Sequence, residues 1–217
     1  SKKELFNMID HYLSCQIRLF LALRGDIAVD RPVANDWTTA EFVEALRRRN
    51  RNYLRHDRNT QIHALANPLT IAVACFPGGN SALGTDNQGE VDRLLEKQDA
   101  GADFAISQVF YKPQVFDEFM TLARKQGVTI PIIAGILPQN NLIGIQKSAK
   151  ILGVSAPTDI LAFFAKLEET EDGQELITKY YADLCKKAYE SGSAGYHFFT
   201  MNKPDLALNV LKLLNIY

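Results

Sequence analysis

The sequence has few cysteines, almost no net charge and no long apolar run. Cys15, Cys75 and Cys185 are far apart and odd in number, which is typical of reduced thiols in a cytoplasmic protein and not of a disulfide framework. Lys and Arg number 24 against 25 Asp and Glu, so the charge gives no indication of a nucleic acid or anionic membrane partner. No run approaches the roughly 20 apolar residues of a membrane helix. No signal peptide is visible at the start.

Several motifs of enzyme sites are also missing. The four histidines do not cluster, and there is no HxH, HExxH or CxxC spacing, so we expect no metal site. A GxSxG elbow is absent, which argues against a serine nucleophile. The glycines of residues 77–89 match neither a GKT/GKS ending nor GxGxxG, so they are no nucleotide fingerprint. His197 lies inside an apolar run, where a barrel-wall residue is expected more often than a catalyst.

Short apolar runs without alternation recur along the chain and end in polar residues. The run over residues 19–23 follows Arg18 and leads directly into Arg24, Gly25 and Asp26. Such runs predict strands buried on both faces, as in the parallel sheet of an α/β protein. Five further candidates follow at residues 69–76, 103–111, 130–137, 153–157 and 195–200, of which 153–157 is short and degenerate.

Amphipathic helices are expected between these strands. The patterns predict helices at residues 1–13, 38–46, 90–99, 113–126, 140–152, 159–167, 173–190 and 206–214. Ser1 is the expected N-cap of the first helix, with Glu4 as its capping-box partner. Thr38 or Thr39 is the expected N-cap of the second helix. This alternation indicates an α/β fold of the (β/α)8 TIM-barrel type with about six of its strands present, in one partial barrel domain over residues 1–217. Because the chain begins on a helix, we expect two further β–α units before it.

The carboxyl ends of the strands are where such a fold carries its functional groups. Asp26 follows Gly25, which lets a ligand approach the backbone. Gln108 can donate and accept hydrogen bonds, which suits the edge of an amide-like heterocycle. On their own, these residues indicate an enzyme that acts on a small polar ligand.

One stretch is strongly basic. It is either a site for phosphate or nucleic acid or a solvated helix face, and the balanced total charge with few interleaved aromatics favours the solvated face. Its members are Arg47, Arg48, Arg49, Arg51, Arg55 and Arg58.

Five segments together resemble the methylenetetrahydrofolate reductase family. They are LALRGD at 21–26, CFPGGN at 75–80, LLEKQDAGADFAISQVFY at 94–111, PIIAGILP at 131–138 and GYHFFTMNK at 195–203. They follow the family's order and cover essentially the whole chain. The resemblance implies a barrel oxidoreductase that reduces 5,10-methylenetetrahydrofolate to 5-methyltetrahydrofolate, with FAD that is reduced by NADH or NADPH.

The resemblance also implies site residues. Asp26 matches a family aspartate near flavin and folate, where a carboxylate stabilises the cationic iminium formed when the methylene bridge opens, so it is the catalytic candidate. Gln108 matches the glutamine that binds the pterin of folate, and Lys203 falls where relatives have an arginine near the folate. The expected flavin contacts are Arg24, Gly25, Asp26, Trp37, Thr38, Asn80 and Lys97.

The sequence also departs from the family pattern. The family's strand ending Tyr-Pro-Glu-x-His is replaced by Phe-Pro-Gly-Gly-Asn at 76–80, which removes an acid and a histidine. The glutamate that serves as general acid on the family's first strand has no counterpart in this chain. Two alternatives therefore stand beside the reductase: a flavin-poor or non-catalytic folate-binding homologue, and an unrelated barrel enzyme that uses the RGD strand for another anionic cofactor.

The remaining expectations concern partners and location. We expect a folate substrate, no nucleic acid or membrane partner, a homo-oligomer and a cytoplasmic location. A barrel that lacks two strands exposes two sheet edges, so these residues alone should be unstable or aggregate.

Overall fold

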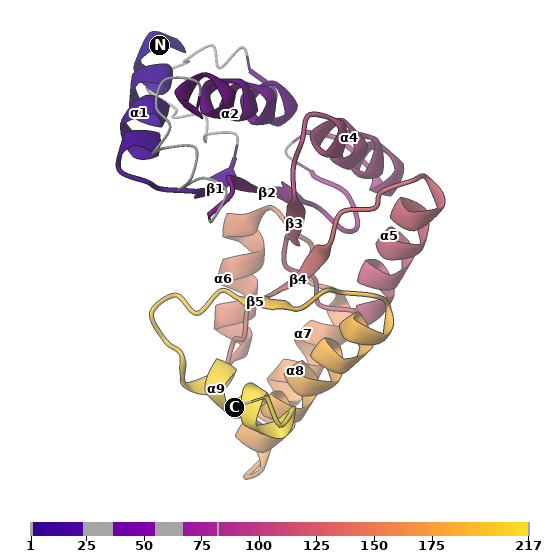
Figure 1. Cartoon of the computed structure of the whole chain (residues 1–217). Coiled ribbons are helices and arrows are strands. Elements are labelled where there is room, and N and C mark those ends of the chain that lie inside the picture. Colours follow the sequence, from indigo (N-terminus) through magenta and orange to yellow (C-terminus); the bar gives the residue numbers. More distant parts are fainter. Residues whose placement is uncertain (1, 24–36, 55–66, 82, 217) are drawn as a thin grey trace. The chain divides into compact units, whose positions relative to one another are not determined.

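Helices and strands alternate along the chain, as the sequence predicts (Figure 1). The computed structural model describes residues 2–23, 37–54, 67–81 and 83–216. The elements are α1 (Lys2–Ser14), β1 (Leu19–Ala22), α2 (Thr39–Leu54), β2 (Thr70–Cys75), α4 (Asn87–Asp99), β3 (Phe104–Ser107), α5 (Pro113–Lys125), β4 (Ile132–Ile136), α6 (Leu142–Leu152), α7 (Thr158–Leu167), α8 (Gly173–Glu190), β5 (Tyr196–Phe198) and α9 (Asp205–Leu213).

The strands form one sheet in the order β1-β2-β3-β4-β5. β1 runs parallel to β2, with Leu19 opposite Thr70, and β4 runs parallel to β5, with Gly135 opposite His197. Each strand is joined to the next through at least one helix among the described residues, which is the connection that parallel pairing needs. The α/β class and five of the six predicted strands are confirmed.

The sixth predicted strand, at 153–157, is wrong. Gly153 adopts a left-handed conformation with φ 65° and ends α6 as its C-cap, where its N–H donates to Ala149 O. Pro157 is already the N-cap of α7. The residues between these caps form a short connection, because a glycine that closes one helix and a proline that opens the next leave no room for a strand.

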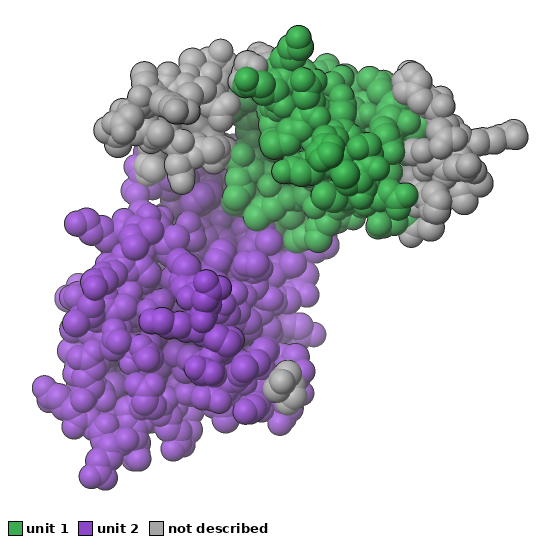
Figure 2. Space-filling model, turned by 90° about the vertical axis from the view of Figure 1, so that its left-hand side faces the viewer, with its two compact units in different colours: residues 1–74, 93–105 green, residues 75–92, 106–217 purple. Residues whose placement is uncertain are grey.

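The residues divide into two compact units (Figure 2). Unit 1 comprises residues 1–74 and 93–105, and unit 2 comprises residues 75–92 and 106–217. In unit 1, α1 packs beside α2, and their facing sides bury Ile9, Leu13, Val43 and Leu46 (Figure 1). The single domain expected from the sequence stays a prediction.

Unit 2 is built around α8, which packs on α5, α7, α9 and β4. Pro113 opens α5, and the side chains of Phe116 and Phe119 that follow it are fully buried. On β4, Ile132 and Ile136 are buried as well. Each large apolar side chain removed from water contributes about 1.5–3 kcal/mol, so this core holds β4 and its neighbours in place.

Two general features bear on the type of protein. None of the helices in the described ranges is long and apolar enough to cross a membrane. Cys15 is exposed and Cys75 and Cys185 are buried, and all three are free thiols.

Candidate functional site

Gln108 lies directly after β3, at the carboxyl end of the strand, as the sequence predicts. Its backbone N–H donates to Cys75 O, the last residue of β2 (2.7 Å), which continues the backbone hydrogen bonding one residue beyond β3. The Oε1 atom of its side chain accepts a hydrogen bond from Val109 N (2.9 Å). This bond holds the amide oxygen of Gln108 beside the backbone, and the NH2 group is the donor end of the same amide.

A glycine in the neighbouring strand allows close packing at the same point. Ser107 Oγ accepts from Gly135 N (2.8 Å) and donates to Gln108 O (2.9 Å). A Cβ atom at Gly135 would lie 2.0 Å from Ser107 O and 3.0 Å from Cε2 of Phe199. Only glycine fits here, because the backbone of β3 and the ring of Phe199 both approach β4 at this residue.

Phe199 continues β5 by one residue, since its N–H donates to Ile136 O (2.8 Å). Its ring makes an edge contact with His197, with centroids 4.6 Å apart and an interplanar angle of 71°. Both side chains are half-buried. Contacts thus connect Ser107, Gly135, Phe199 and His197, and together with Gln108, which follows Ser107 in sequence, we call these residues the strand-end cluster.

The other side of β5 faces helices. Tyr196 and Phe198 line a groove of about 640 Å³ together with Lys186, Tyr189, Glu190, Gly195, Leu211, Leu214 and Ile216 from β5, α8, α9 and their ends. Because successive residues of a strand point to opposite faces, His197 and Phe199 lie on the face away from this groove. The groove and the strand-end cluster are thus separate features of unit 2.

Two tyrosines of α8 hold the loops that follow β3 and β4. The Tyr180 hydroxyl donates to Tyr111 O (2.5 Å), and the Tyr181 hydroxyl accepts from Gln139 N (3.0 Å). Burial raises the pKa of both tyrosines well above the ordinary value, so each hydroxyl keeps its proton. These two bonds connect α8 to the segments that follow β3 and β4.

The loop after β2 contains Asn80, an expected flavin contact. Three successive N–H groups of this loop bond within the chain: Gly78 N to Asn87 Oδ1 (2.7 Å), Gly79 N to Phe76 O (3.0 Å) and Asn80 N to Thr85 O (2.9 Å). These N–H groups are thus directed at protein acceptors and do not form an anion-binding nest. The role of the Asn80 side chain stays a prediction.

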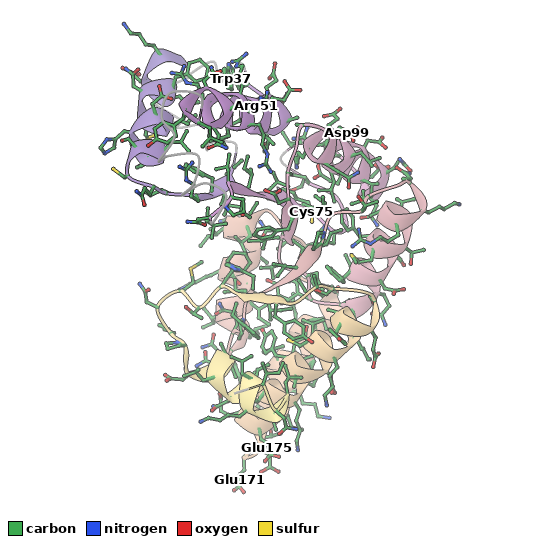
Figure 3. All side chains as sticks on the ribbon, viewed as in Figure 1. Trp37, Arg51, Cys75, Asp99, Glu171 and Glu175 are labelled. Atoms are coloured by element: carbon green, nitrogen blue, oxygen red, sulfur yellow. The ribbon has the colours of Figure 1, made fainter. Side chains whose placement is uncertain are left out.

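Trp37 and Thr38 precede α2 in unit 1. Thr38 is the N-cap: its N–H donates to Glu41 Oε2 (2.7 Å), and its Oγ1 accepts from Glu41 N (3.2 Å). This reciprocal capping box confirms the predicted cap. Figure 3 shows Trp37 beside α2. Its ring packs edge-on against Phe6 of α1, with ring centroids 5.4 Å apart. Both residues have structural contacts here, and their expected contact with flavin stays a prediction.

Lys97 lies on α4 and is only 5% exposed. Its Nζ donates to Ala74 O of β2 (2.8 Å), so the ammonium group reaches the backbone near the carboxyl end of that strand. The expected flavin contact of Lys97 stays a prediction.

Lys203 follows β5 in a tight turn. Its N–H donates to Thr200 O (2.8 Å), and the two central residues, Met201 and Asn202, have φ values of 48° and 60°. Positive φ at both central positions defines a type I′ turn, which asparagine tolerates and methionine adopts at a cost. Lys203 is exposed and lies in the turn that begins after Phe199.

Arg24, Gly25 and Asp26, the three expected contacts from the first strand, lie outside the described residues, as does the predicted cap Ser1. The structure therefore leaves their predicted roles untested. Within unit 2 it brings Gly135 together with Ser107 and Phe199, and Ser107 directly precedes Gln108. Sequence reasoning named Gln108 but missed the contributions of Gly135 and Phe199, although an isolated glycine inside the strand IIAGI is a signal of close backbone approach.

The basic stretch is only partly a solvated face. Arg47 makes four hydrogen bonds within unit 1, to Gly101 O through both Nε and Nη2, to Leu69 O and to Asp103 Oδ2. Asp103 also accepts from Ile71 N (2.6 Å). Arg49 pairs with Asp10 of α1 at 2.6 Å. Arg48 and Arg51 are exposed, and Arg55 and Arg58 lie outside the described part.

No group of three or more His, Cys, Asp or Glu side chains with metal-binding geometry occurs among the residues that the structure describes.

The chain is similar to proteins of one family. The family model for methylenetetrahydrofolate reductase matches residues 1–215. The chain is 25% identical to the Probable methylenetetrahydrofolate reductase (NADPH) of Caenorhabditis elegans, over 100% of this chain and 31% of that protein. It is 29% identical to Methylenetetrahydrofolate reductase 1 of Schizosaccharomyces pombe, over 95% of this chain and 32% of that protein.

The similarity to a bacterial relative covers most of the length of that relative. The 5,10-methylenetetrahydrofolate reductase of Buchnera aphidicola is 27% identical, over 99% of this chain and 66% of that protein. The chain thus spans about a third of the length of the two eukaryotic relatives and 66% of the bacterial one. The chain belongs to the methylenetetrahydrofolate reductase family, and its α/β fold is of the (β/α)8 barrel type of that family.

Proposed function

We propose that this chain takes part in the reduction of 5,10-methylenetetrahydrofolate to 5-methyltetrahydrofolate, with NADH or NADPH as reductant and FAD as the redox cofactor. Family membership supports the proposal. The observation that carries it is the side-chain amide of Gln108, which is fixed at the carboxyl end of β3 by its bond from Val109 N (2.9 Å). An amide held in one plane can pair with the polar edge of a pterin, whereas a mobile amide would lose conformational entropy on binding.

The donor chemistry of unit 1 fits FAD. Lys97 offers an ammonium group for the diphosphate, Thr38 a hydroxyl group and Trp37 an indole ring, and the resemblance adds Arg24, Gly25 and Asp26. In the loop after β2, the N–H groups of Gly78, Gly79 and Asn80 bond within the chain and are directed away from a cofactor. When bound, FAD would accept a hydride from the nicotinamide and deliver it to the folate.

The residues of the chain have distinct tasks in this proposal. Gln108 orients the pterin ring. Lys203, exposed in the turn after β5, attracts the negatively charged glutamate end of folate. Asp26 stabilises the cationic iminium that forms when the methylene bridge opens.

The test uses the protein expressed from its full-length gene and desalted after addition of FAD. A retained flavin absorption band and oxidation of NADH or NADPH that depends on 5,10-methylenetetrahydrofolate are the expected results. Gln108→Ala should raise the KM for folate about tenfold, the value of one strong hydrogen bond. Gln114→Ala, which removes an exposed amide at the start of α5, is the matched control and should change nothing. A protein that neither binds folate nor oxidises either nucleotide in its presence would refute the proposal.

A second candidate function is a folate-binding protein that holds FAD weakly or not at all. The bonds within the loop after β2, together with Gly78 and Asn80 where the family has an acid and a histidine, favour it. A colourless protein that still binds folate, and loses that binding in Gln108→Ala, would support this function over the reductase.

We also propose a cytoplasmic location and self-association. The three free thiols support a reducing compartment. Large apolar side chains that are exposed on helices, such as Ile143 at 59% and Ile151 at 77%, support contact between copies. Sedimentation of the full-length protein measures its oligomeric state, and a monomer at all concentrations would contradict the proposed self-association.

A further inference from the structure

Tyr180 of α8 has apolar neighbours around its ring and a polar partner in another segment. The ring packs against Phe163 and Phe164 of α7, with centroids 5.6 and 5.5 Å apart. A phenylalanine would fill this position equally well, so the packing does not account for the hydroxyl group. That group donates to Tyr111 O (2.5 Å), and Tyr111 follows Gln108 closely in the segment after β3.

The carbonyl group of Tyr111 needs a donor because of the way α5 begins. Lys112 is the N-cap of α5, and Pro113, which has no N–H, is its first residue. Lys112 O accepts from Val115 N (3.2 Å), so Tyr111 O lies before the hydrogen bonds of the helix. Tyr111 is only 3% exposed, and a buried carbonyl without a donor is destabilising. Tyr180 supplies that donor from a different helix.

The segment from Gln108 to Tyr111 is held at both ends. At its start, Gln108 N donates to Cys75 O (2.7 Å), and at its end Tyr111 O accepts from Tyr180. Between these two bonds, Val109 N donates to the side-chain Oε1 of Gln108 (2.9 Å). Because the segment is so short, a backbone shift at its end would move the N–H that holds the amide. The hydroxyl of Tyr180 is therefore connected to the amide of Gln108 through this backbone.

A second contact holds the same part of the chain from the surface. Lys112 Nζ lies 2.8 Å from Asp159 Oδ2 of α7, and the two side chains are 37% and 63% exposed. Ion pairs of this kind contribute little, because water and salt screen them. The hydrogen bond from Tyr180 reaches a buried residue, so it is the stronger of these two contacts.

We propose that Tyr180 is a positioning residue for the folate site: through Tyr111 O it fixes the backbone after β3, and with it the orientation of the Gln108 amide. The proposal rests on the proposed function, in which Gln108 binds the pterin. Tyr180 acts through Gln108 and not on the ligand itself. Its contribution to folate binding therefore cannot exceed that of Gln108, and it disappears when the amide is removed.

The test is a double-mutant cycle in the full-length protein. Tyr180→Phe removes the hydroxyl group and keeps the ring that packs against α7, so the variant should fold. It is combined with Gln108→Ala, and the binding of 5-methyltetrahydrofolate is titrated in the unmodified protein, the two single variants and the double variant. Urea denaturation of the same proteins measures their stability, because the loss of a hydrogen bond lowers stability whether or not it positions Gln108.

Tyr181→Phe is the matched control, at the next residue of α8. Its hydroxyl accepts from Gln139 N in the segment after β4 (3.0 Å), so the same change removes a hydrogen bond to a different segment. This variant should also lose stability. Any effect that it has on folate binding should be the same with and without the Gln108 amide, because its bond does not lie on the segment that carries Gln108.

We expect Tyr180→Phe to weaken folate binding roughly three- to fivefold when Gln108 is present, and by less than about 1.5-fold in the Gln108→Ala background. Equal weakening in both backgrounds would show a general loosening of unit 2 and would overturn the proposal. A cycle for Tyr181→Phe that couples to Gln108 as strongly as that of Tyr180→Phe would overturn it too.

The remaining outcomes separate this role from the proposed function. If Gln108→Ala weakens binding and Tyr180→Phe does not, the positioning role is refuted and the proposed function stands. If Gln108→Ala leaves binding unchanged, the role of Gln108 in the proposed function is refuted, and the positioning role with it. An unmodified protein that does not bind 5-methyltetrahydrofolate would refute both.

Discussion

Gly135→Ala should destabilise unit 2 strongly. The new Cβ atom would lie 2.0 Å from the backbone oxygen of Ser107, a distance that the two strands can only relieve by moving apart. Overpacking of this kind costs typically 1–3 kcal/mol. Separation of the strands also weakens the bond from Gly135 N to Ser107 Oγ (2.8 Å), which is worth about 1 kcal/mol. We therefore expect a loss of about 3 kcal/mol in the free energy of unfolding, measured by urea denaturation.

Gly195→Ala is the matched control. A Cβ atom at Gly195 would meet no atom within 4 Å, and the residue also borders β5. Here the substitution should leave stability unchanged or raise it by up to about 1 kcal/mol, because alanine restricts the unfolded chain. If both variants unfold within about 0.5 kcal/mol of the unmodified protein, the close approach of β3 to β4 is wrong.

Three further predictions concern other parts of the chain. Arg47→Ala removes four hydrogen bonds in unit 1 and should lower the free energy of unfolding, measured in urea, by about 2–4 kcal/mol. The control Arg48→Ala, at an exposed position, should change this free energy by less than about 0.5 kcal/mol. Equal effects of the two substitutions would contradict the structure. Burial raises the pKa of Cys185 to about 12, so at pH 8 iodoacetamide should modify Cys15 and spare Cys185 until the protein unfolds. The folded state holds the proton of the Cys185 thiol more tightly than the unfolded state does. The contribution of this neutral thiol to the free energy of unfolding is therefore complete below the ordinary thiol pKa and is lost as the pH rises towards 12. Met201→Gly should raise the melting temperature, because glycine adopts φ 48° without the cost of about 1 kcal/mol that a side chain incurs there; a lower melting temperature would contradict the turn.

Most of the fold follows from local patterns in the sequence. Apolar runs and amphipathic stretches locate five strands and the helices between them, and α8 begins and ends at the predicted residues. The prediction of a strand at 153–157 is wrong because it relied on small apolar residues and did not consider the backbone conformation of Gly153. That glycine takes φ 65° to end α6, a backbone state that apolar periodicity does not reveal.

The residues of the candidate site are harder to predict from the sequence than the helices and strands are. Gln108 could be found because it directly follows a recognisable strand. The contribution of Phe199 depends on Gly135, which is far away in sequence and beside it only through the pairing of β4 with β5. Arg47 is a similar case: its partners Leu69, Gly101 and Asp103 come from segments that the chain brings together only on folding.

The hydrogen bonds of Arg47 also reduce the electrostatic potential that its charge produces in the surrounding solvent. A guanidinium group whose donors are directed at two backbone carbonyls and a carboxylate sends little electric field into the solvent, and Arg49 is similarly paired with Asp10. Of the arginines along α2, Arg47 and Arg49 therefore attract distant anions less than the exposed Arg48 and Arg51 do. Long-range steering of an anionic substrate would depend on exposed charges such as Lys203, Arg48 and Arg51, and added salt should slow the arrival of folate through those charges.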